Sequence, residues 1–207
     1  MPSMPVKMHL LPLLAFSLSI YACSLASLIL DLSPPIAEEN EHQNQHPIPL
    51  PLLPTLFNPP TLTSDPFTTE SIRRTLALYP LAIDGKDFAA LSHVFAPGAV
   101  ANYSAPLNVL TPLQTIQDTL SASLSCVTTQ HSLGTQVIDI LSPVSARSVT
   151  YYTAAHFGMG ALSDQVAVAH GQYQDLWERQ GHGGWRVVVR DLVYMSEVIG
   201  NKAVFVC

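Results

Sequence analysis

The C-terminal half of this chain alternates between apolar and polar residues, and this alternation constrains the fold more than any other feature. A period of two is typical of β-strands that bury one face. From Val127 onward it predicts four long strands, at 127–141, 146–158, 165–179 and 184–199. Residues 181–184 predict a tight hairpin turn, and Gly134 predicts a bulge that bends the first long strand. The chain is therefore expected to end in an antiparallel sheet.

Helix-like segments precede these strands. The first begins near Thr69, a predicted N-cap, and apolar residues then recur at helical spacing. A short second helix is expected over 88–95. A third follows Thr111-Pro112-Leu113-Gln114, which predicts a capping box with proline in the first turn. These elements indicate an α+β domain over residues 69–200. In it, a curved antiparallel or mixed sheet packs on three helices as a cone with one open mouth.

The first 68 residues lack this periodicity. Lys7 precedes an apolar run that reaches residue 30 and contains small residues near its end, which is typical of a cleaved signal peptide over 1–30. The run is about 20 residues long, so an uncleaved membrane anchor is the alternative. Residues 31–68 hold nine prolines, a density that opposes both helix and strand. We expect a disordered linker there and a short C-terminal tail over 201–207.

Charge and composition exclude several functions. Of the 207 residues, 48% are hydrophobic and 12% are charged, with a formal charge of −6. No block of Lys or Arg exists, so the sequence lacks the electrostatic footprint of a nucleic-acid-binding protein. It also lacks the Cys and His spacing of a zinc site, a phosphate loop and a nucleotide fingerprint. We therefore expect no metal and no organic cofactor, and a small molecule as the partner.

Cysteines and a glycosylation sequon favour export. If residues 1–30 are removed, Cys126 and Cys207 remain, and a disulfide between them fits an oxidising compartment. Two free, partly buried thiols are the alternative. Asn102-Tyr103-Ser104 is a predicted N-glycosylation site. We expect a secreted protein or one in the lumen of the secretory pathway, with membrane contact only if the N-terminal segment stays attached.

Four chemically active side chains could meet in one pocket. His131 and His156 lie 25 residues apart, each in an alternating segment. Asp84 ends the first predicted helix, and Tyr103 lies on a short strand over 99–103. An acid, a phenol and two imidazoles suit proton transfer. Asp84 is expected either to be buried against a histidine or to be an exposed helix cap.

Strand parity suggests which other residues could line that pocket. Tyr103 faces away from Asn102, so it points inward if Asn102 carries a glycan; a structural core tyrosine is the alternative. Tyr152 lies on the predicted inner face of the second long strand. Gln172 and Gln174 share one face of the third, where they would either orient polar groups of a substrate or be exposed.

Residues 70–198 resemble the SnoaL-like branch of the nuclear transport factor 2-like superfamily, and within it the fungal scytalone dehydratases. Three segments carry the likeness: Asp84-Gly85-Lys86-Asp87, Phe95-Ala96-Pro97 through Tyr103, and Thr129-Gln130-His131. The separations from Asp84 to Tyr103 and from His131 to His156 also match that family. The resemblance implies a cone-shaped α+β barrel with a cofactor-free site inside it.

The resemblance also implies roles for individual residues. Asp84 would orient and charge a histidine, and His131 and His156 would form the acid–base pair. Tyr103 would be one of two tyrosines that hold a water against a substrate carbonyl. Ile83 stands where the family has the second of these tyrosines, so this chain departs from the family pattern there.

The function implied by this likeness is that of a dehydratase, or a related cyclase or isomerase. Its substrate would be a small polyketide-derived or similar secondary metabolite. Gln172 and Gln174 fall where the family has polar substrate contacts. A secreted, non-catalytic carrier for an apolar ligand is one alternative. A module that forms a homo-oligomer through the outer face of the sheet is another.

Overall fold

The computed structural model describes residues 47–57 and 65–206. The predicted signal peptide or anchor over 1–30, parts of the predicted linker and Cys207 lie outside the described residues. The chain divides into two compact units, Met1–Glu39 and Asn40–Cys207, and everything described below belongs to the second. Within the described ranges, no helix is both long and apolar enough to span a bilayer.

The long helix α2 (Pro66–Asp84) begins at a proline and is capped by the residue before it. The Asp65 carboxylate accepts hydrogen bonds from the backbone N–H groups of Phe67 and Thr68, at 3.1 and 3.2 Å. The helix therefore starts before the predicted N-cap Thr69, because Asp65 supplies the cap. Its most deeply buried large side chains recur at helical spacing and are Ile72, Leu76, Tyr79 and Ile83.

The two shorter helices differ in detail from their predictions. The second is the 3₁₀ helix η3 (Phe88–His93), and the Asp87 carboxylate caps it by accepting the Ala90 N–H at 3.1 Å. The third, α3 (Leu113–Ser123), follows Pro112, and no side chain caps it. The capping box predicted at 111–114 is wrong, because Pro112 rather than Thr111 occupies the N-cap position.

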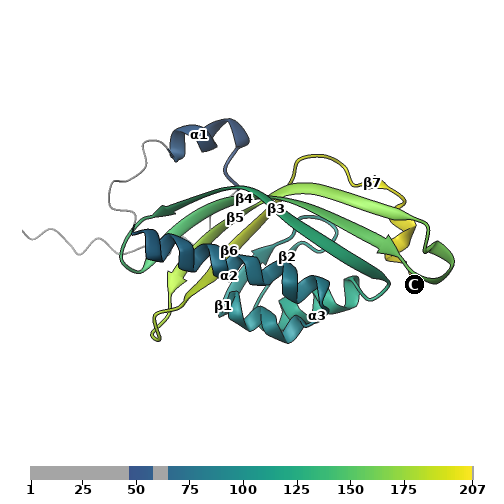
Figure 1. Cartoon of the computed structure of the whole chain (residues 1–207), viewed down its shortest axis with the longest axis horizontal. Helices are drawn as coiled ribbons and strands as arrows, with labels where there is room; N and C mark the ends of the chain where they lie inside the picture. The colour runs from purple at the N-terminus through teal and green to yellow at the C-terminus, as the bar shows by residue number, and fades with distance from the viewer. Residues whose placement is uncertain (1–46, 58–64, 207) are drawn as a thin grey trace, which may run out of the picture. The chain divides into compact units, whose positions relative to one another are not determined.

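A mixed seven-stranded sheet forms most of the rest (Figure 1). Its order is β2-β1-β6-β5-β4-β3, and β7 pairs with β5. The bounds are β1 (Phe95–Asn102), β2 (Val109–Leu110), β3 (Val127–Ile140), β4 (Ser145–Gly158), β5 (Val166–Arg179), β6 (Trp185–Tyr194) and β7 (Ile199–Gly200). β1 and β6 run parallel, whereas the long strands β3 to β6 pair antiparallel. The four predicted strands are confirmed, although the last one ends before residue 199.

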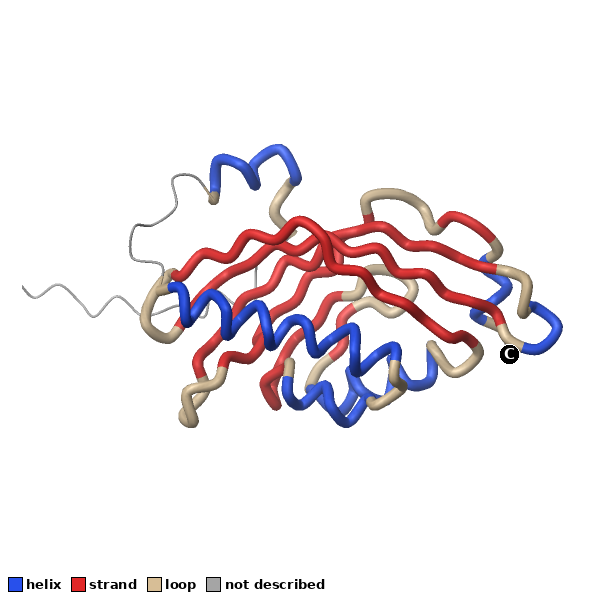
Figure 2. Tube along the Cα trace, in the orientation of Figure 1, coloured by secondary structure: helices blue, strands red, loops and turns tan. Residues whose placement is uncertain are grey.

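The sheet curves over α2 and α3 (Figure 2). The register between β3 and β4 shifts between Leu133 and Gln136, at the bulge predicted beside Gly134. A second shift, between Leu176 and Trp177, lies where β5 pairs with β6. The predicted α+β class and curved mixed sheet are confirmed. The sheet does not close into a barrel, because its terminal strands β2 and β3 do not pair with each other.

One end of the inner face buries an ion pair among aromatic rings, and we call it the packed end. Arg190 on β6 donates two hydrogen bonds to Asp175 on β5, at 2.7 and 2.8 Å, and both side chains are 0% exposed. The guanidinium lies 4.4 Å from the ring centroid of Tyr79 and 4.2 Å from that of Tyr173. This ion pair joins β5 to β6 behind two tyrosine rings.

Residues 47–57, which we call the strap, are ordered although the sequence predicts a linker there. They form the 3₁₀ turn η2 (Leu50–Leu52) and the short helix α1 (Leu53–Leu56). Side chains of the sheet hold the strap through hydrogen bonds to its backbone. The prediction of disorder over 31–68 is therefore wrong for the strap, because this proline-rich segment finds polar partners on the sheet.

Candidate active site

A cavity of about 840 Å³ lies between α2, α3 and the inner face of the sheet. Five of the predicted site residues line it: Ile83, Tyr103, His131, Tyr152 and His156. Much of the remaining lining is apolar or tyrosine, and residues of the C-terminal segment 195–205 contribute to one side. We call the region around the two histidines the open end. The structure thus brings together residues that the sequence scatters over a helix, two strands and the segment that follows β1.

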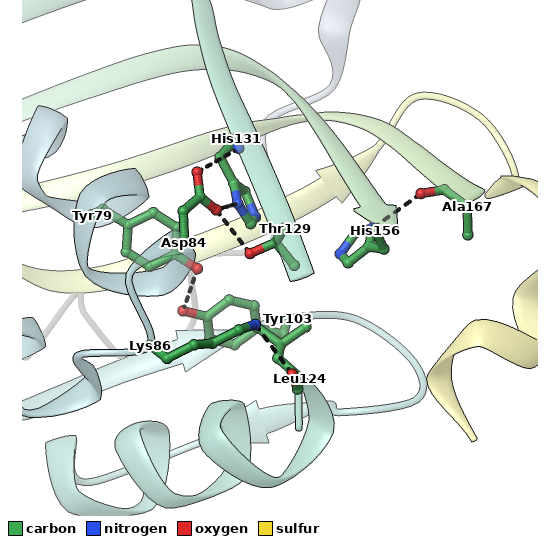
Figure 3. A network of polar contacts seen from close by, with 9 residues as sticks. All are labelled: Tyr79, Asp84, Lys86, Tyr103, Leu124, Thr129, His131, His156 and Ala167. Carbon is green, nitrogen blue, oxygen red and sulfur yellow. Dashed lines mark hydrogen bonds and ion pairs between the residues drawn. The ribbon is translucent and has the colours of Figure 1, made fainter. Parts of the chain in front are cut away.

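Asp84 and His131 form a fixed pair at this end (Figure 3). The His131 Nδ1 atom lies 2.7 Å from Asp84 Oδ1, and the His131 backbone N–H donates to Oδ2 at 2.8 Å. The Thr129 hydroxyl donates to Oδ1 at 2.9 Å. Of the two alternatives for Asp84, the structure shows the one in which the carboxylate meets a histidine. Two residues of β3 therefore hold the carboxylate at the end of α2.

The electrostatics of Asp84 keep it charged. Burial by itself raises the pKa of this carboxyl, but the hydrogen bonds from His131 and Thr129 outweigh burial, and the pKa is lowered overall. Because an ionised carboxylate only accepts hydrogen bonds, the ring Nδ1 of His131 carries a proton. In the neutral ring, Nε2 then holds the lone pair that can accept a proton from a substrate.

His156 is more deeply buried, and no carboxylate of the described residues forms a hydrogen bond or ion pair with it. The whole residue is 8% exposed, and its ring Nδ1 lies 3.3 Å from the carbonyl oxygen of Ala167. Burial, followed by the charge of His131, lowers the pKa of His156 to about 4. A carbonyl oxygen can only accept, so Nδ1 donates and Nε2 carries the lone pair. His156 is therefore neutral at neutral pH.

The two imidazoles face one cavity from adjacent strands. Their ring centroids lie 6.1 Å apart in an edge-to-face arrangement. Phe205 of the 3₁₀ helix η5 (Lys202–Phe205) packs on His156, with ring centroids 4.8 Å apart. The C-terminal segment therefore shields His156 from solvent on one side.

Tyr79 is a site residue that sequence reasoning missed. Its hydroxyl lies 3.1 Å from the hydroxyl of Tyr103, and both side chains line the cavity. Burial raises the pKa of both phenols, so both keep their protons as potential hydrogen-bond donors. The available signal was its position one helical turn before Ile83, on the same face of α2. The chain thus presents two tyrosines to the cavity even though residue 83 is isoleucine.

Tyr152 lines the cavity beside this pair. Its ring stacks on that of Tyr173, with centroids 4.4 Å apart and an interplanar angle of 11°. Its hydroxyl is buried and has no hydrogen-bond partner in the described part of the chain. Gly171 leaves room for this ring, since a Cβ there would lie 2.8 Å from the Tyr152 hydroxyl.

The predicted substrate contacts Gln172 and Gln174 do not line the cavity. They lie on the outer face of β5, where Gln174 binds the backbone of Ile48 in the strap. Strand alternation places the intervening Tyr173 inward instead. The predicted role of the two glutamines is therefore corrected: they share a face, as expected, but it is the face opposite the cavity.

Two further predictions concern export. Asn102 is half-buried, and its Nδ2, the atom to which a glycan would be attached, donates to Asp191 at 3.2 Å. Its glycosylation stays a prediction. Cys126 is disulfide-bonded, so the free-thiol alternative is wrong for this residue. The cysteine bonded to it lies outside the described residues. Cys207 also lies outside them, so the pairing of Cys126 with Cys207 stays a prediction.

Over 47–57 and 65–206, no three His, Cys, Asp or Glu side chains cluster closely enough to hold a metal ion. The groups that could act on a bound molecule are instead an imidazole–carboxylate pair, a neutral imidazole and phenols. Such a set can take up, hold and return protons.

Comparison with known proteins bears on the fold. The model of the SnoaL-like domain family matches residues 68–191, more than half of the chain. Among curated proteins, none matches the sequence significantly.

Several solved structures share the architecture. One is a protein of Novosphingobium aromaticivorans provisionally assigned as a scytalone dehydratase, with 20% identity and a TM-score of 0.57 over 63% of this chain and 85% of that one. The protein Kfla4162 of Kribbella flavida has 19% identity and a TM-score of 0.60 over 68% and 98%. The hexachlorocyclohexane dehydrochlorinase LinA-type3 of Novosphingobium barchaimii has 9% identity and a TM-score of 0.57 over 65% and 90%. At these identities the likeness shows the shared fold.

Proposed function

The chain belongs to the SnoaL-like domain family, and from that premise we propose that its cavity is the active site of a cofactor-free lyase. The observation that carries the proposal is the convergence of the Asp84–His131 pair, neutral His156 and the Tyr79–Tyr103 pair on one cavity. Two of the structural neighbours, a provisionally assigned dehydratase and a dehydrochlorinase, are named for elimination reactions, which is consistent with this proposal. The reaction is elimination of water, with cyclisation or isomerisation as related outcomes of the same proton transfers.

In the proposed reaction, His131 is the base. Its Nε2 removes the proton from the carbon next to a substrate carbonyl, and the charge of Asp84 stabilises the imidazolium that forms. The electron pair of the broken C–H bond moves toward the carbonyl oxygen. The C–O bond to the hydroxyl on the next carbon then breaks, and the departing oxygen takes the proton back from His131 as water. A positioned acid–base group of this kind contributes about 10²–10⁴ in rate.

The other groups act on the two ends of the same substrate. The Tyr79–Tyr103 pair stays protonated and donates a hydrogen bond to the carbonyl oxygen while negative charge develops there. Neutral His156 accepts a hydrogen bond from the departing hydroxyl through Nε2 and so orients it toward His131. The largely apolar, tyrosine-lined cavity suits a small ring ketone, such as a polyketide-derived secondary metabolite.

The proposed compartment is the secretory pathway or the extracellular space. The disulfide at Cys126 supports an oxidising environment, because cytosolic thiols are usually kept reduced. The predicted signal over residues 1–30 supports the same location.

The proposed chemistry is tested with 3-hydroxy-1-tetralone, which becomes fluorescent 1-naphthol when it loses water. The wild-type protein is expected to release 1-naphthol. His131→Ala and His156→Asn are each expected to lower the rate by about 10²–10⁴. His182→Ala, which changes an exposed histidine in a turn, is the matched control and is expected to keep the wild-type rate.

Retained folding is checked by circular dichroism for every variant. Wild-type rates in both site variants would end the proposed mechanism. A carrier is the second candidate function, because Ile83 presents an apolar surface to the cavity at a position where the scytalone dehydratases have a tyrosine. A protein that binds the tetralone tightly and returns it unchanged would support the carrier instead.

A further inference from the structure

The inner face of β4 carries only small side chains between Tyr152 and His156. Ala154 lies between them, and the strand register pairs it with His131 on β3 and with Ala169 on β5. Both alanines line the cavity. Four residues of strand, about 13 Å, separate Tyr152 from His156. We call the two alanines the floor, and it is long enough for a flat, fused ring system.

The ring of Tyr152 closes one end of the floor. One side of this ring stacks on Tyr173, with centroids 4.4 Å apart and an interplanar angle of 11°. On β5, Tyr173 and Ala169 lie two residues to either side of Gly171, which pairs with Tyr152. The side of the ring that is turned away from Tyr173 therefore faces the floor. A Cβ at Gly171 would lie 2.7 Å from the ring carbon Cε1, so the glycine makes room for this ring.

The hydroxyl of Tyr152 needs an acceptor that the chain does not provide. The residue is 4% exposed, and its hydroxyl forms no hydrogen bond with the part of the chain that the structure describes. Burial raises the pKa of this phenol, so the hydroxyl keeps its proton and can donate. A buried donor without a partner costs free energy, which an acceptor on a bound molecule would recover. Because Tyr152 lines the cavity, that molecule is a ligand of the cavity.

We propose that Ala154, Ala169 and Tyr152 form a subsite for one flat ring of the substrate, and that this ring carries an oxygen that accepts a hydrogen bond from Tyr152. The substrate is then a fused-ring ketone with two oxygen acceptors. Its reacting carbonyl meets the Tyr79–Tyr103 pair, and its second oxygen meets Tyr152. The assignment rests on the proposed function for the carbonyl that reacts, whereas binding of the ring is independent of turnover.

The first test measures binding to the full-length protein. The probes are 1-naphthol and its 5-, 6-, 7- and 8-methoxy derivatives, which are fluorescent and whose methoxy oxygen accepts but does not donate. The wild type is expected to bind at least one methoxy derivative about tenfold more tightly than 1-naphthol. Tyr152→Phe keeps the stacked ring and is expected to abolish this preference. Tyr151→Phe, on the opposite face of β4, is the matched control and is expected to retain it.

Folding provides a readout that needs no ligand. Tyr152→Phe removes a hydroxyl that lacks a partner, so the urea midpoint of the ligand-free protein is expected to stay the same or rise. A lower midpoint would show that the hydroxyl has a partner within the protein and would overturn the proposal.

The floor is tested with Ala154→Leu, which fills the space above it. This variant is expected to bind every naphthol at least about tenfold more weakly. Ala155→Leu, which points to the opposite face of β4, is its control. Tyr152→Phe keeps the proposal testable if Ala154→Leu does not fold, because it preserves the packing of the ring.

Three results would overturn the subsite: no methoxy derivative binds the wild type more tightly than 1-naphthol, Tyr152→Phe keeps the preference, or folded Ala154→Leu binds like the wild type. Failure of the proposed reaction gives a different result. In that case 3-hydroxy-1-tetralone is not turned over, while the preference for a methoxy derivative and its loss in Tyr152→Phe are still measured.

Discussion

The two ends of the inner face each pair a nitrogen base with a carboxylate, but they use the pair differently. At the packed end, Arg190 and Asp175 are both fully buried and joined by two hydrogen bonds. At the open end, His131 meets Asp84, whose side chain is 25% exposed. A guanidinium cannot lose its proton in a protein, whereas an imidazole exchanges protons near neutral pH. The packed end therefore holds a permanent charge for structure, and the open end holds a ring nitrogen that suits proton transfer.

Tyr79 connects the two ends. Its ring lies over the guanidinium of Arg190, while its hydroxyl meets Tyr103 in the cavity. The charge of Arg190 opposes the effect of burial on the pKa of this phenol. The Arg190–Asp175 pair thus supports the catalytic groups that we propose without itself lining the cavity.

The largest expected effect breaks the ion pair at the packed end. Asp175→Ala leaves Arg190 charged, buried and without its partner, so we expect the free energy of unfolding to fall by about 3–5 kcal/mol. Asp84→Ala is expected to cost about 1 kcal/mol, because that carboxylate is 25% exposed and therefore partly solvated. Urea denaturation at pH 7 measures both values. Equal losses in the two variants would contradict the contrast between the ends.

A smaller effect depends on pH and belongs to the open end. His156 has a pKa of about 4 in the folded protein, against about 6.5 when unfolded. Between these values the unfolded chain binds a proton that the folded chain does not. The free energy of unfolding should therefore fall as the pH drops from 6.5 to 4, by about 3 kcal/mol in total. Urea denaturation across this range measures the slope.

The His156→Asn variant tests whether His156 causes this pH dependence of the free energy of unfolding. It is expected to flatten the profile between pH 6.5 and 4, while His182→Ala keeps the wild-type profile because residue 182 is exposed. A slope that survives in His156→Asn would mean that another group titrates there.

The smallest effect is expected where the two ends meet. Tyr79→Phe keeps the ring against Arg190 but deprives the Tyr103 hydroxyl of its partner, so stability should fall by about 1 kcal/mol. The elimination rate with 3-hydroxy-1-tetralone should fall by about tenfold, since one donor to the carbonyl is disturbed. Tyr151→Phe, on the opposite face of β4, is the control. A rate loss of the same size in both variants would remove Tyr79 from the proposed site.

Much of the candidate site could be predicted because strand parity is a local property. His156 and Tyr152 both line the cavity, as their spacing on one strand predicts. Parity also shows that Gln172 and Gln174 share a face, but it does not show which face is inside. Both faces of β5 are buried, so its sequence does not alternate between apolar and polar residues. The prediction therefore placed the two glutamines on the inner face, although they lie on the outer one.

The sequence alone determined the curved sheet, its helices and the residues that could exchange protons, because periodicity and residue chemistry are written along the chain. Only the tertiary structure decided that Asp84 meets His131, that Tyr79 meets Tyr103, and that the strap docks on the outer face of β4 and β5. Each of these contacts joins segments whose distance depends on how α2 and the sheet pack, and neither spacing nor composition encodes that packing. The strap shows this most clearly, since its prolines predict an extended chain but not the glutamine and arginine that hold it.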